Sequence, residues 1–358
     1  MLNYIKIENF RNLVKDKIDV SSRHVILCGE NGQGKTNFIE AIYYLIFAAS
    51  FREQKEEFIC RNQEDHFILF GEFSQQKDFN DRLGVLWDKN NGKRIVLNGL
   101  EIRDRKELVA SFPCIAFFHD DLQLIDGSME RRRRFFDQIL SLISPSYIDS
   151  LRRYKKVLRQ RNLVLRTNQN SMLDVYTQQL LDVGLVLMQE RAKMAVLFQE
   201  VFAPLMLDSS NLDIHCLYQP NWKLTEKEEI LKVFSEKQEQ EIRQGVTLYG
   251  PHRDRYMFSF GGKEASHYLS LGQKRLLALC LKSAASLLFY QQSHREPILL
   301  LDDIFLELTH AARERFLSHL PPYRQAFFTF LPQELAHIQL DSPLIYFVKK
   351  GKLEKYER

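Results

Sequence analysis

Residues 29–36 read Gly29-Glu30-Asn31-Gly32-Gln33-Gly34-Lys35-Thr36. This is the pattern G-x-x-x-x-G-K-T of a phosphate-binding loop. An apolar strand, Val25 to Cys28, precedes the loop, and the sequence predicts a helix from about Lys35 to Phe47. In this context the glycines let consecutive backbone N–H groups point into one concavity, and the helix N-terminus adds partial positive charge. The segment therefore predicts an α/β nucleotide-binding domain.

The loop and the next residue, Asn37, are the expected ATP contacts. Lys35 provides a point charge for the β- and γ-phosphates and is expected to take part in catalysis, while the Thr36 hydroxyl is an expected Mg²⁺ ligand. ATP and Mg²⁺ are therefore the cofactors that this segment predicts.

A second acidic element follows an apolar run at residues 297–301 and ends in Asp302-Asp303. Such a run predicts a buried parallel strand whose polar end lies at the ligand edge of the sheet. We expect Asp302 to hold Mg²⁺ through water and Asp303 to orient or deprotonate the attacking water. A pair of acids after a strand also occurs as a helix cap, but the upstream phosphate-binding loop favours the metal interpretation.

A third motif, Leu269-Ser270-Leu271-Gly272-Gln273, leads directly into a predicted helix. Serine is a preferred N-cap residue, and a helix N-terminus attracts anions. One chain does not need two γ-phosphate sites, so we expect Ser270, Gly272 and Gln273 to contact the ATP of a second copy. Segments of the form L-S-x-G-Q define the ABC ATPases; an ordinary capped helix is the alternative interpretation.

The distribution of patterns along the chain predicts two domains. Residues 1–118 and 246–358 are expected to form one discontinuous α/β head with two sheet-containing parts, mixed parallel and antiparallel, including a meander between residues 67 and 97. Residues 119–245 show apolar spacing of three and four and are expected to form an inserted helical arm.

The bulk composition is typical of a globular protein, with 45% hydrophobic residues and 27% charged residues. The five cysteines are odd in number and form no C-x-x-C pair, so neither a disulfide framework nor a zinc site is expected. The N-terminal residues contain no signal-peptide pattern, and the apolar run from Ala41 to Ala49 is far shorter than the about 20 residues that span a membrane. We expect a cytoplasmic protein without a membrane partner.

Three further segments are informative: residues 7–13 (IENFRNL), 121–137 (DLQLIDGSMERRRRFFD) and 249–254 (YGPHRD). Together with the three motifs above, and in the same order along the chain, they resemble the RecF family over nearly the full length. The resemblance implies an ABC-type ATPase related to the SMC proteins. It also implies that Arg11 and Asn12 lie near the nucleotide.

Further expectations about function rest on the same resemblance. Members of the family bind DNA at gaps and at junctions of single- and double-stranded DNA, dimerise on ATP, and work with RecR and RecO to help load RecA. The sequence departs from the family at His119 and Met129, where proline is usual, and at Leu306 and Thr309, where a small residue and an acid are usual. Since the loop with Leu306 and Thr309 normally faces the partner's nucleotide, slow hydrolysis is expected.

Positive charge is concentrated in one segment. Between Arg131 and Arg166 there are eleven lysine or arginine residues and two acids, whereas the whole chain has a formal net charge of +4. Four of these cations share one face of a predicted helix and are our candidate DNA contacts, Arg152, Lys155, Lys156 and Arg159. A merely solvated face is the alternative, and for the run 131–134 we favour structural roles.

Several alternatives remain open. His252 and Arg253 could contact DNA or sense nucleotide, while Gly250-Pro251 could simply end a strand. The chain could instead be the ATPase subunit of a membrane transporter, a DNA-binding scaffold in which ATP serves as a structural clamp, or, with less support, an ATPase-linked nuclease. Steady-state ATPase activity with and without DNA separates the enzyme from the scaffold.

Overall fold

The computed structural model describes residues 1–74, 79–167, 170–223, 226–304, 310–337 and 340–356. The chain forms two compact units: Met1–Asp120 with His294–Arg358, and Asp121–Ser293. The first boundary lies close to the expected one, but residues 246–293 group with the second unit rather than with the first. The reason is non-local packing, because strand β10 (Arg255–Phe260) pairs with β9 (Ile214–Gln219) and helix α8 (Leu271–Ser293) packs against α6 (Leu173–Ser210).

The first unit contains a mostly parallel sheet with the strand order β15-β14-β3-β13-β12-β8. All neighbours in it are parallel except the edge pair β14 and β15. Its strands are β3 (His24–Cys28), β8 (Cys114–Phe118), β12 (Ile298–Asp302), β13 (Gln325–Phe330), β14 (Leu344–Lys349) and β15 (Lys352–Lys355). Every residue of the three central strands is buried, which explains their nearly continuous apolar sequences.

A second, antiparallel sheet in the same unit has the order β2-β1-β4-β5-β6-β7. Its strands are β1 (Leu2–Glu8), β2 (Asp16–Asp19), β4 (His66–Ser74), β5 (Asn80–Asp88), β6 (Gly92–Leu97) and β7 (Leu100–Glu101). Alternate residues of β4 are buried, as expected for a sheet with one face on a core. The predicted meander is thus present as β4, β5 and β6.

Helix α1 (Lys35–Phe47) follows the phosphate-binding loop and shares one hydrophobic core with residues of both sheets. Its bounds are those that the sequence predicts. The unit also contains the helices α2 (Lys106–Ser111) and α9 (His310–Ser318). This arrangement fixes the start of α1 at the carboxyl ends of the parallel strands.

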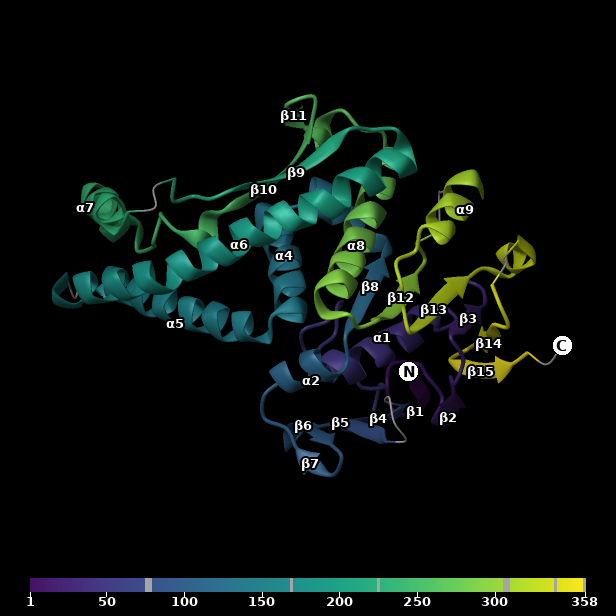
Figure 1. Cartoon of the computed structure of the whole chain (residues 1–358). Coiled ribbons are helices and arrows are strands. Elements are labelled where there is room, and N and C mark those ends of the chain that lie inside the picture. Colours follow the sequence, from purple (N-terminus) through teal and green to yellow (C-terminus); the bar gives the residue numbers. More distant parts are fainter. Residues whose placement is uncertain (75–78, 168–169, 224–225, 305–309, 338–339, 357–358) are drawn as a thin grey trace. The chain divides into compact units, whose positions relative to one another are not determined.

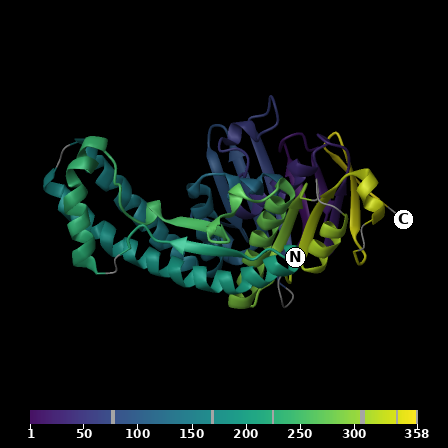
Figure 2. The same ribbon diagram turned by 90° about the horizontal axis from the view of Figure 1, so that it is seen from above.

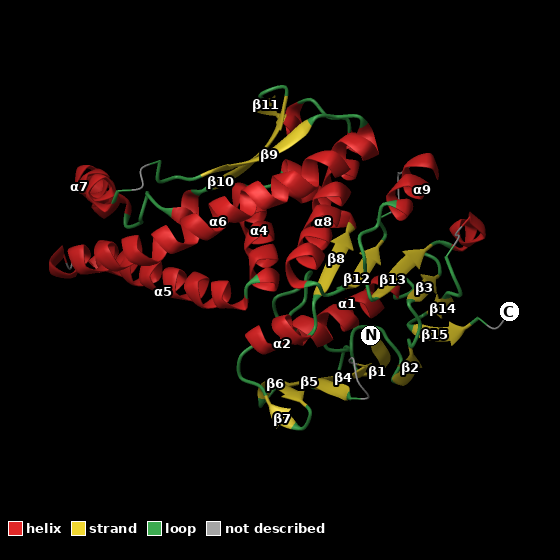
Figure 3. Cartoon of the chain, in the orientation of Figure 1, coloured by secondary structure: helices red, strands yellow, loops and turns green. Residues whose placement is uncertain are grey.

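The second unit is largely helical, as the red ribbons of Figure 3 show. Its helices are α3 (Gln123–Asp126), α4 (Met129–Ile143), α5 (Pro145–Thr167), α6, α7 (Lys227–Gln244) and α8. Helices α5 and α6 run side by side in Figure 1, and Figure 2 shows the same pairing from above. A separate hydrophobic core connects α4, α5, α6 and α8.

A three-stranded sheet of order β11-β10-β9 completes this unit, with β11 at Lys263–Glu264. Strand β9 corrects the expectation that residues 119–245 are helical throughout. Residues 214–217 alternate between buried and exposed, which suits a strand, but the partner β10 follows only after α7. Among the described residues, no helix combines the length and the apolar character that crossing a membrane requires.

Candidate functional site

The phosphate-binding loop lies where β3 ends and α1 begins. Lys35 is buried, and its Nζ donates to the carbonyl oxygens of Gly29 at 2.7 Å and Glu30 at 3.1 Å. Gly34 has a φ of 117°, and a Cβ on Gly29 would lie 2.5 Å from the backbone oxygen of Val348. Glycine is therefore required at both positions, by backbone conformation at one and by close approach at the other.

The acidic pair stands at the end of β12, close to the start of α1. The Thr36 hydroxyl donates to Oδ1 of Asp302 at 3.2 Å, so the two expected metal ligands converge. Burial, together with the charge of Asp303, raises the pKa of Asp302 to about 7. A cation at this position would offset the burial that disfavours the charged carboxylate.

These oxygen donors fit Mg²⁺, which commonly uses one or two protein ligands together with phosphate oxygens and waters. No cluster of three or more histidine, cysteine or acidic residues that could hold a metal ion occurs in the part of the chain that the structure describes. A cation at Thr36 and Asp302 would therefore depend on a bound nucleotide for further ligands.

Sequence reasoning missed Thr329 on β13, which contacts both acids. Its Oγ1 accepts a hydrogen bond from the backbone N–H of Asp303 at 2.8 Å and lies 3.2 Å from Oδ1 of both Asp302 and Asp303. The available signal was a threonine near the end of an otherwise apolar strand segment, Ala326 to Phe330.

Arg11 and Asn12, which the family resemblance places near the nucleotide, lie around α1. The Arg11 guanidinium forms a two-pronged ion pair with Glu40 of α1, with N–O distances of 3.0 and 2.8 Å. Oδ1 of Asn12 accepts from Nδ2 of Asn37 at 2.8 Å. Sequence reasoning did not identify Glu40, whose side chain is fully buried. Its role is to fix Arg11 against the helix that carries Lys35.

Gln33 connects the loop to the turn between β14 and β15. Its side-chain Oε1 accepts from the backbone N–H of Lys350 at 2.8 Å, and its backbone oxygen accepts from the N–H of Gly351 at the same distance. The turn between β14 and β15 therefore supports the outer side of the phosphate-binding loop.

In the second unit, the L-S-x-G-Q segment starts α8 with a reciprocal cap. The backbone N–H of Ser270 donates to Oε1 of Gln273 at 2.9 Å, and that of Gln273 donates to Oγ of Ser270 at 3.3 Å. Ser270 and Gly272 are exposed, and a Cβ on Gly272 would meet nothing within 4 Å. The capped helix of the simpler interpretation is present, and the helix start is accessible to a ligand.

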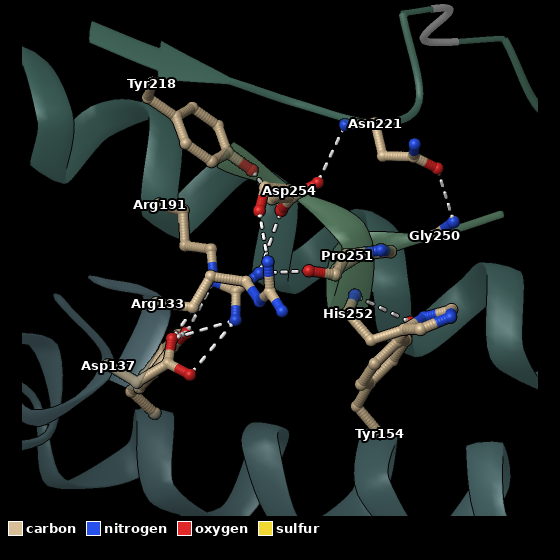
Figure 4. A network of polar contacts seen from close by, with 11 residues as sticks. Arg133, Asp137, Tyr154, Arg191, Tyr218, Asn221, Gly250, Pro251, His252 and Asp254 are labelled. Carbon is tan, nitrogen blue, oxygen red and sulfur yellow. Dashed lines mark hydrogen bonds and ion pairs between the residues drawn. The ribbon is translucent and has the colours of Figure 1, made fainter. Parts of the chain in front are cut away.

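The 249–254 block forms part of a buried polar network within the second unit (Figure 4). Arg191 donates to the Asp254 carboxylate at 2.8 Å and to the Pro251 carbonyl at 2.7 Å. Nδ1 of His252 lies 2.7 Å from the Tyr154 hydroxyl, and burial lowers the pKa of this histidine to about 4. His252 is thus neutral and held by α5, which favours a structural role, whereas Arg253 is exposed.

The basic segment divides into buried and exposed members. The guanidinium of Arg132 is buried and donates to backbone carbonyls of Leu124, Ile125 and Tyr256. Arg161 is equally buried and pairs with Glu241 at 2.7 Å. Both therefore have structural roles, which for Arg132 agrees with the structural preference for the run 131–134.

The four candidate DNA contacts are all exposed on α5: Arg152, Lys155, Lys156 and Arg159. Arg152 lies 3.9 Å from Asp149, a weak pair at the surface. Within the described residues the other three form no salt bridge. Their charge is therefore largely uncompensated.

The departures at His119 and Met129 have a simple structural setting. His119 is the first residue of a 3-10 helix, and Met129 is the first residue of α4, after the N-cap Ser128. Proline is favoured at a first helical position, but any residue with helical backbone angles fits there. The other two departures, Leu306 and Thr309, lie outside the described residues.

Comparison with known proteins agrees with this geometry. A model of the RecF/RecN/SMC N terminal domain matches residues 1–349. The DNA replication and repair protein RecF of Treponema pallidum (strain Nichols) is 34% identical over 351 residues, covering 96% of this chain and 98% of the relative. The RecF of Shouchella clausii (strain KSM-K16) is 33% identical over 373 residues and both chains are covered completely, at 100%.

Solved structures show the same relationship. The structure of the recombination mediator protein RecF-ATP in the RecFOR pathway matches with a TM-score of 0.90 and 25% identity, covering 99% of this chain and 97% of that one. An SMC head bound to the C-winged helix domain of ScpA matches with a TM-score of 0.59 at 14% identity, covering 99% and 96% of the two chains. The predicted fold class, an ABC-type ATPase head with an inserted helical arm, is confirmed.

Proposed function

The chain belongs to the RecF family of DNA replication and repair proteins, and on this basis we propose that it is an ATP-dependent DNA-binding protein of recombinational repair. It dimerises on ATP at gapped DNA or at junctions of single- and double-stranded DNA. Together with RecO and RecR it assists RecA loading, a role supported by the RecFOR pathway of the structurally matched RecF.

One observation carries the nucleotide part of this proposal. Lys35 and Thr36 at the start of α1 and the acids at the end of β12 converge at one edge of the parallel sheet. On ATP binding, Lys35 exchanges its two backbone carbonyl partners for phosphate oxygens, because a full negative charge attracts its ammonium more strongly than a carbonyl dipole does. Asp303 orients the attacking water or accepts its proton.

Thr36 and Asp302 would hold Mg²⁺, which would neutralise part of the phosphate charge. The remaining loop residues, Gly29 to Gln33, surround the phosphates with backbone N–H groups. The proposed contacts also include Arg11, Asn12 and Asn37. A hydrogen bond joins Asn12 and Asn37 beside the loop, and the ion pair of Arg11 with Glu40 fixes it against α1.

The second nucleotide contact comes from another copy of the chain. Ser270, Gly272 and Gln273 lie at the exposed start of α8, where backbone N–H groups and the helix dipole favour an anion. We assign this surface to the γ-phosphate of the partner's ATP, which makes the dimer ATP-dependent. Leu306 and Thr309 lie outside the described residues, and it is their departure from the family pattern that leads us to expect slow hydrolysis.

DNA binding is assigned to the exposed cations on α5, through phosphate contacts that do not depend on base sequence. The alternative of a DNA-binding scaffold, in which ATP serves as a structural clamp, also remains. It rests on Leu306 and Thr309, which depart from the family in the loop that the resemblance places opposite the partner's nucleotide. Membership of the RecF family argues against a transporter subunit.

Sedimentation velocity with Mg-ATP, with and without gapped DNA, tests the proposal. We expect a monomer without nucleotide, a dimer with Mg-ATP, and a DNA-bound dimer when gapped DNA is added. A chain that remains monomeric with Mg-ATP and DNA contradicts it. Steady-state hydrolysis measured in parallel separates the slow ATPase from the scaffold, which shows binding without turnover.

A further inference from the structure

Thr329 occupies a central position in the parallel sheet. Strand β13 lies between β3, which leads into the phosphate-binding loop, and β12, which ends in the acidic pair. Thr329 pairs in register with Leu27 of β3 and is 2% exposed. Its hydroxyl is therefore held at the carboxyl edge of the sheet, between the two motifs that the proposed reaction uses.

The hydroxyl has three polar neighbours. Oγ1 accepts from the Asp303 N–H at 2.8 Å, and Oδ1 atoms of Asp302 and Asp303 both lie 3.2 Å away. A hydroxyl has a single proton, so it donates to one of these carboxylates at a time. Both distances are longer than the usual 2.7–2.8 Å of an O–H···O bond, and the two oxygens are alternative acceptors of that proton.

The two carboxylates differ in their other donors. Asp302 Oδ1 also accepts from the Thr36 hydroxyl at 3.2 Å. For Asp303, no side-chain donor besides Thr329 is found within the described part of the chain. Among the described residues, Asp303 therefore relies on Thr329 for its side-chain donor, whereas Asp302 has a second donor in Thr36.

The backbone of Asp303 depends on the same side chain. Its φ is 50°, a left-handed conformation that L-residues rarely adopt. The hydrogen bond from its N–H to Thr329 Oγ1 helps to hold this conformation at the point where the chain leaves β12. The direction of the Asp303 side chain follows from that backbone.

We propose that Thr329 is a positioning residue for ATP hydrolysis, which holds the backbone of Asp303 through its oxygen and the carboxylate of Asp303 through its proton. Thr329 touches neither ATP nor the attacking water and acts only through Asp303. The inference rests on the proposed ATPase function and extends it to a residue that none of the sequence motifs contains.

Two substitutions separate the hydroxyl from the shape of the side chain. Thr329→Val keeps the volume and removes the hydroxyl, whereas Thr329→Ser keeps the hydroxyl. We expect both variants to bind ATP within about twofold of the parent. Single-turnover hydrolysis by Thr329→Val falls on the order of 10- to 100-fold, because small displacements of a catalytic group cost about that much. Thr329→Ser recovers to within a few-fold of the parent.

Amide hydrogen exchange provides a readout that needs no nucleotide. The peptide covering residues 298–304 should exchange faster in Thr329→Val, which lacks the acceptor for the Asp303 N–H, and at the parental rate in Thr329→Ser. If Thr329→Val does not fold, Thr329→Ala replaces it, since alanine also lacks the hydroxyl and adds no bulk.

The outcomes distinguish the two proposals. A parent that neither binds nor hydrolyses ATP refutes the proposed function and, with it, the catalytic role of Thr329. If the parent is active, parental hydrolysis by Thr329→Val overturns the inference, as does a Thr329→Ser variant as slow as Thr329→Val. Unchanged exchange of the 298–304 peptide in Thr329→Val overturns it independently of any activity.

Discussion

At the scale of single residues, Lys35 and Asp303 are expected to fail in different ways. Lys35→Met removes the charge that attracts the phosphates, so ATP affinity should fall by at least about tenfold. Asp303→Asn keeps Thr36 and Asp302, so ATP should still bind and the dimer should form, while turnover is lost. Equilibrium binding of a fluorescent ATP analogue and steady-state hydrolysis measure the two effects. Loss of ATP binding in Asp303→Asn would show that this carboxylate holds the nucleotide instead.

Asp302 should make the nucleotide-free protein less stable as the pH rises. Its pKa is raised from 3.8 to about 7, mainly by burial, so the folded state keeps a proton between about pH 4 and 7 that the unfolded state has lost. Folding stability therefore decreases across this window and stays low above it. Asp302→Asn cannot ionise at this side chain and should stabilise the metal-free protein at pH 8 by about 1–3 kcal/mol. This is less than the full conversion of the pKa shift at about 1.4 kcal/mol per pKa unit.

Thermal unfolding without nucleotide or Mg²⁺ checks this expectation. The gain in Tm of Asp302→Asn should shrink as the pH is lowered toward 4. A variant that is destabilised equally at pH 8 and pH 5 would mean that the carboxylate is stabilised by its neighbours rather than strained by burial. Stability gained with loss of function is common at active sites.

Site residues that belong to a local sequence motif could be predicted from the sequence. Residues that position them from other strands could not. Lys35, Thr36 and the acidic pair follow apolar strands at fixed spacing, so the pattern alone indicates their place. Thr329 lies 2.8 Å from the Asp303 amide but stands in a different strand. A parallel-sheet register is set by packing across strands that are distant in the chain, and single-sequence patterns do not contain it.

At the scale of secondary-structure elements, the exposed face of α5 is expected to carry the salt dependence of DNA binding. The triple change of Arg152, Lys155 and Arg159 to alanine should weaken binding for all sequences. The slope of log K against log salt should decrease by about 0.9 for each DNA phosphate that the variant no longer neutralises. Fluorescence anisotropy with gapped DNA at several salt concentrations measures this slope.

A matched control is available on α7, where Lys232, Lys237 and Arg243 are also exposed but stand among acidic residues. Changing these three to alanine removes the same charge and should leave the slope unchanged. Equal effects of the two triple variants would indicate a general charge effect, and an unchanged slope for the α5 variant would place the DNA elsewhere.

Elements with a strong local period could be predicted, and the misassigned ones depend on distant partners. The expected helix from about Lys35 to Phe47 agrees with α1 because a glycine-rich loop marks its start. Strand β9 was missed because its partner β10 is separated from it by α7. Which cations of the basic segment are exposed also depends on distant partners, since the buried Arg161 pairs with Glu241 of α7.

At the scale of the whole molecule, the expected division near residue 245 and the observed one near 293 reflect two kinds of information. Sequence patterns show where helical spacing ends, and compact units reflect which elements pack together. Helix α8 begins with a nucleotide motif but packs against α6, so the L-S-x-G-Q segment groups with the helical unit. A composite ATP site would therefore require the helical unit of one copy and the α/β unit of another.

This composite site makes a prediction that only the assembly can test. Ser270→Arg should bind ATP like the parent, because Ser270 serves the opposite subunit, but should not dimerise, since a large cation replaces the serine where the partner's phosphate docks. Lys35→Met should not dimerise either, at ATP concentrations that its lowered affinity leaves unbound. A mixture of the two variants should nevertheless form dimers with Mg-ATP, because the ATP held by a Ser270→Arg subunit faces the intact Ser270 of a Lys35→Met subunit.

Sedimentation velocity of each variant alone and of the equimolar mixture measures this complementation. A mixture that remains monomeric would mean that one composite site is insufficient for assembly. Loss of ATP binding by Ser270→Arg as a monomer would instead show that Ser270 contacts the nucleotide of its own chain, which excludes the shared site.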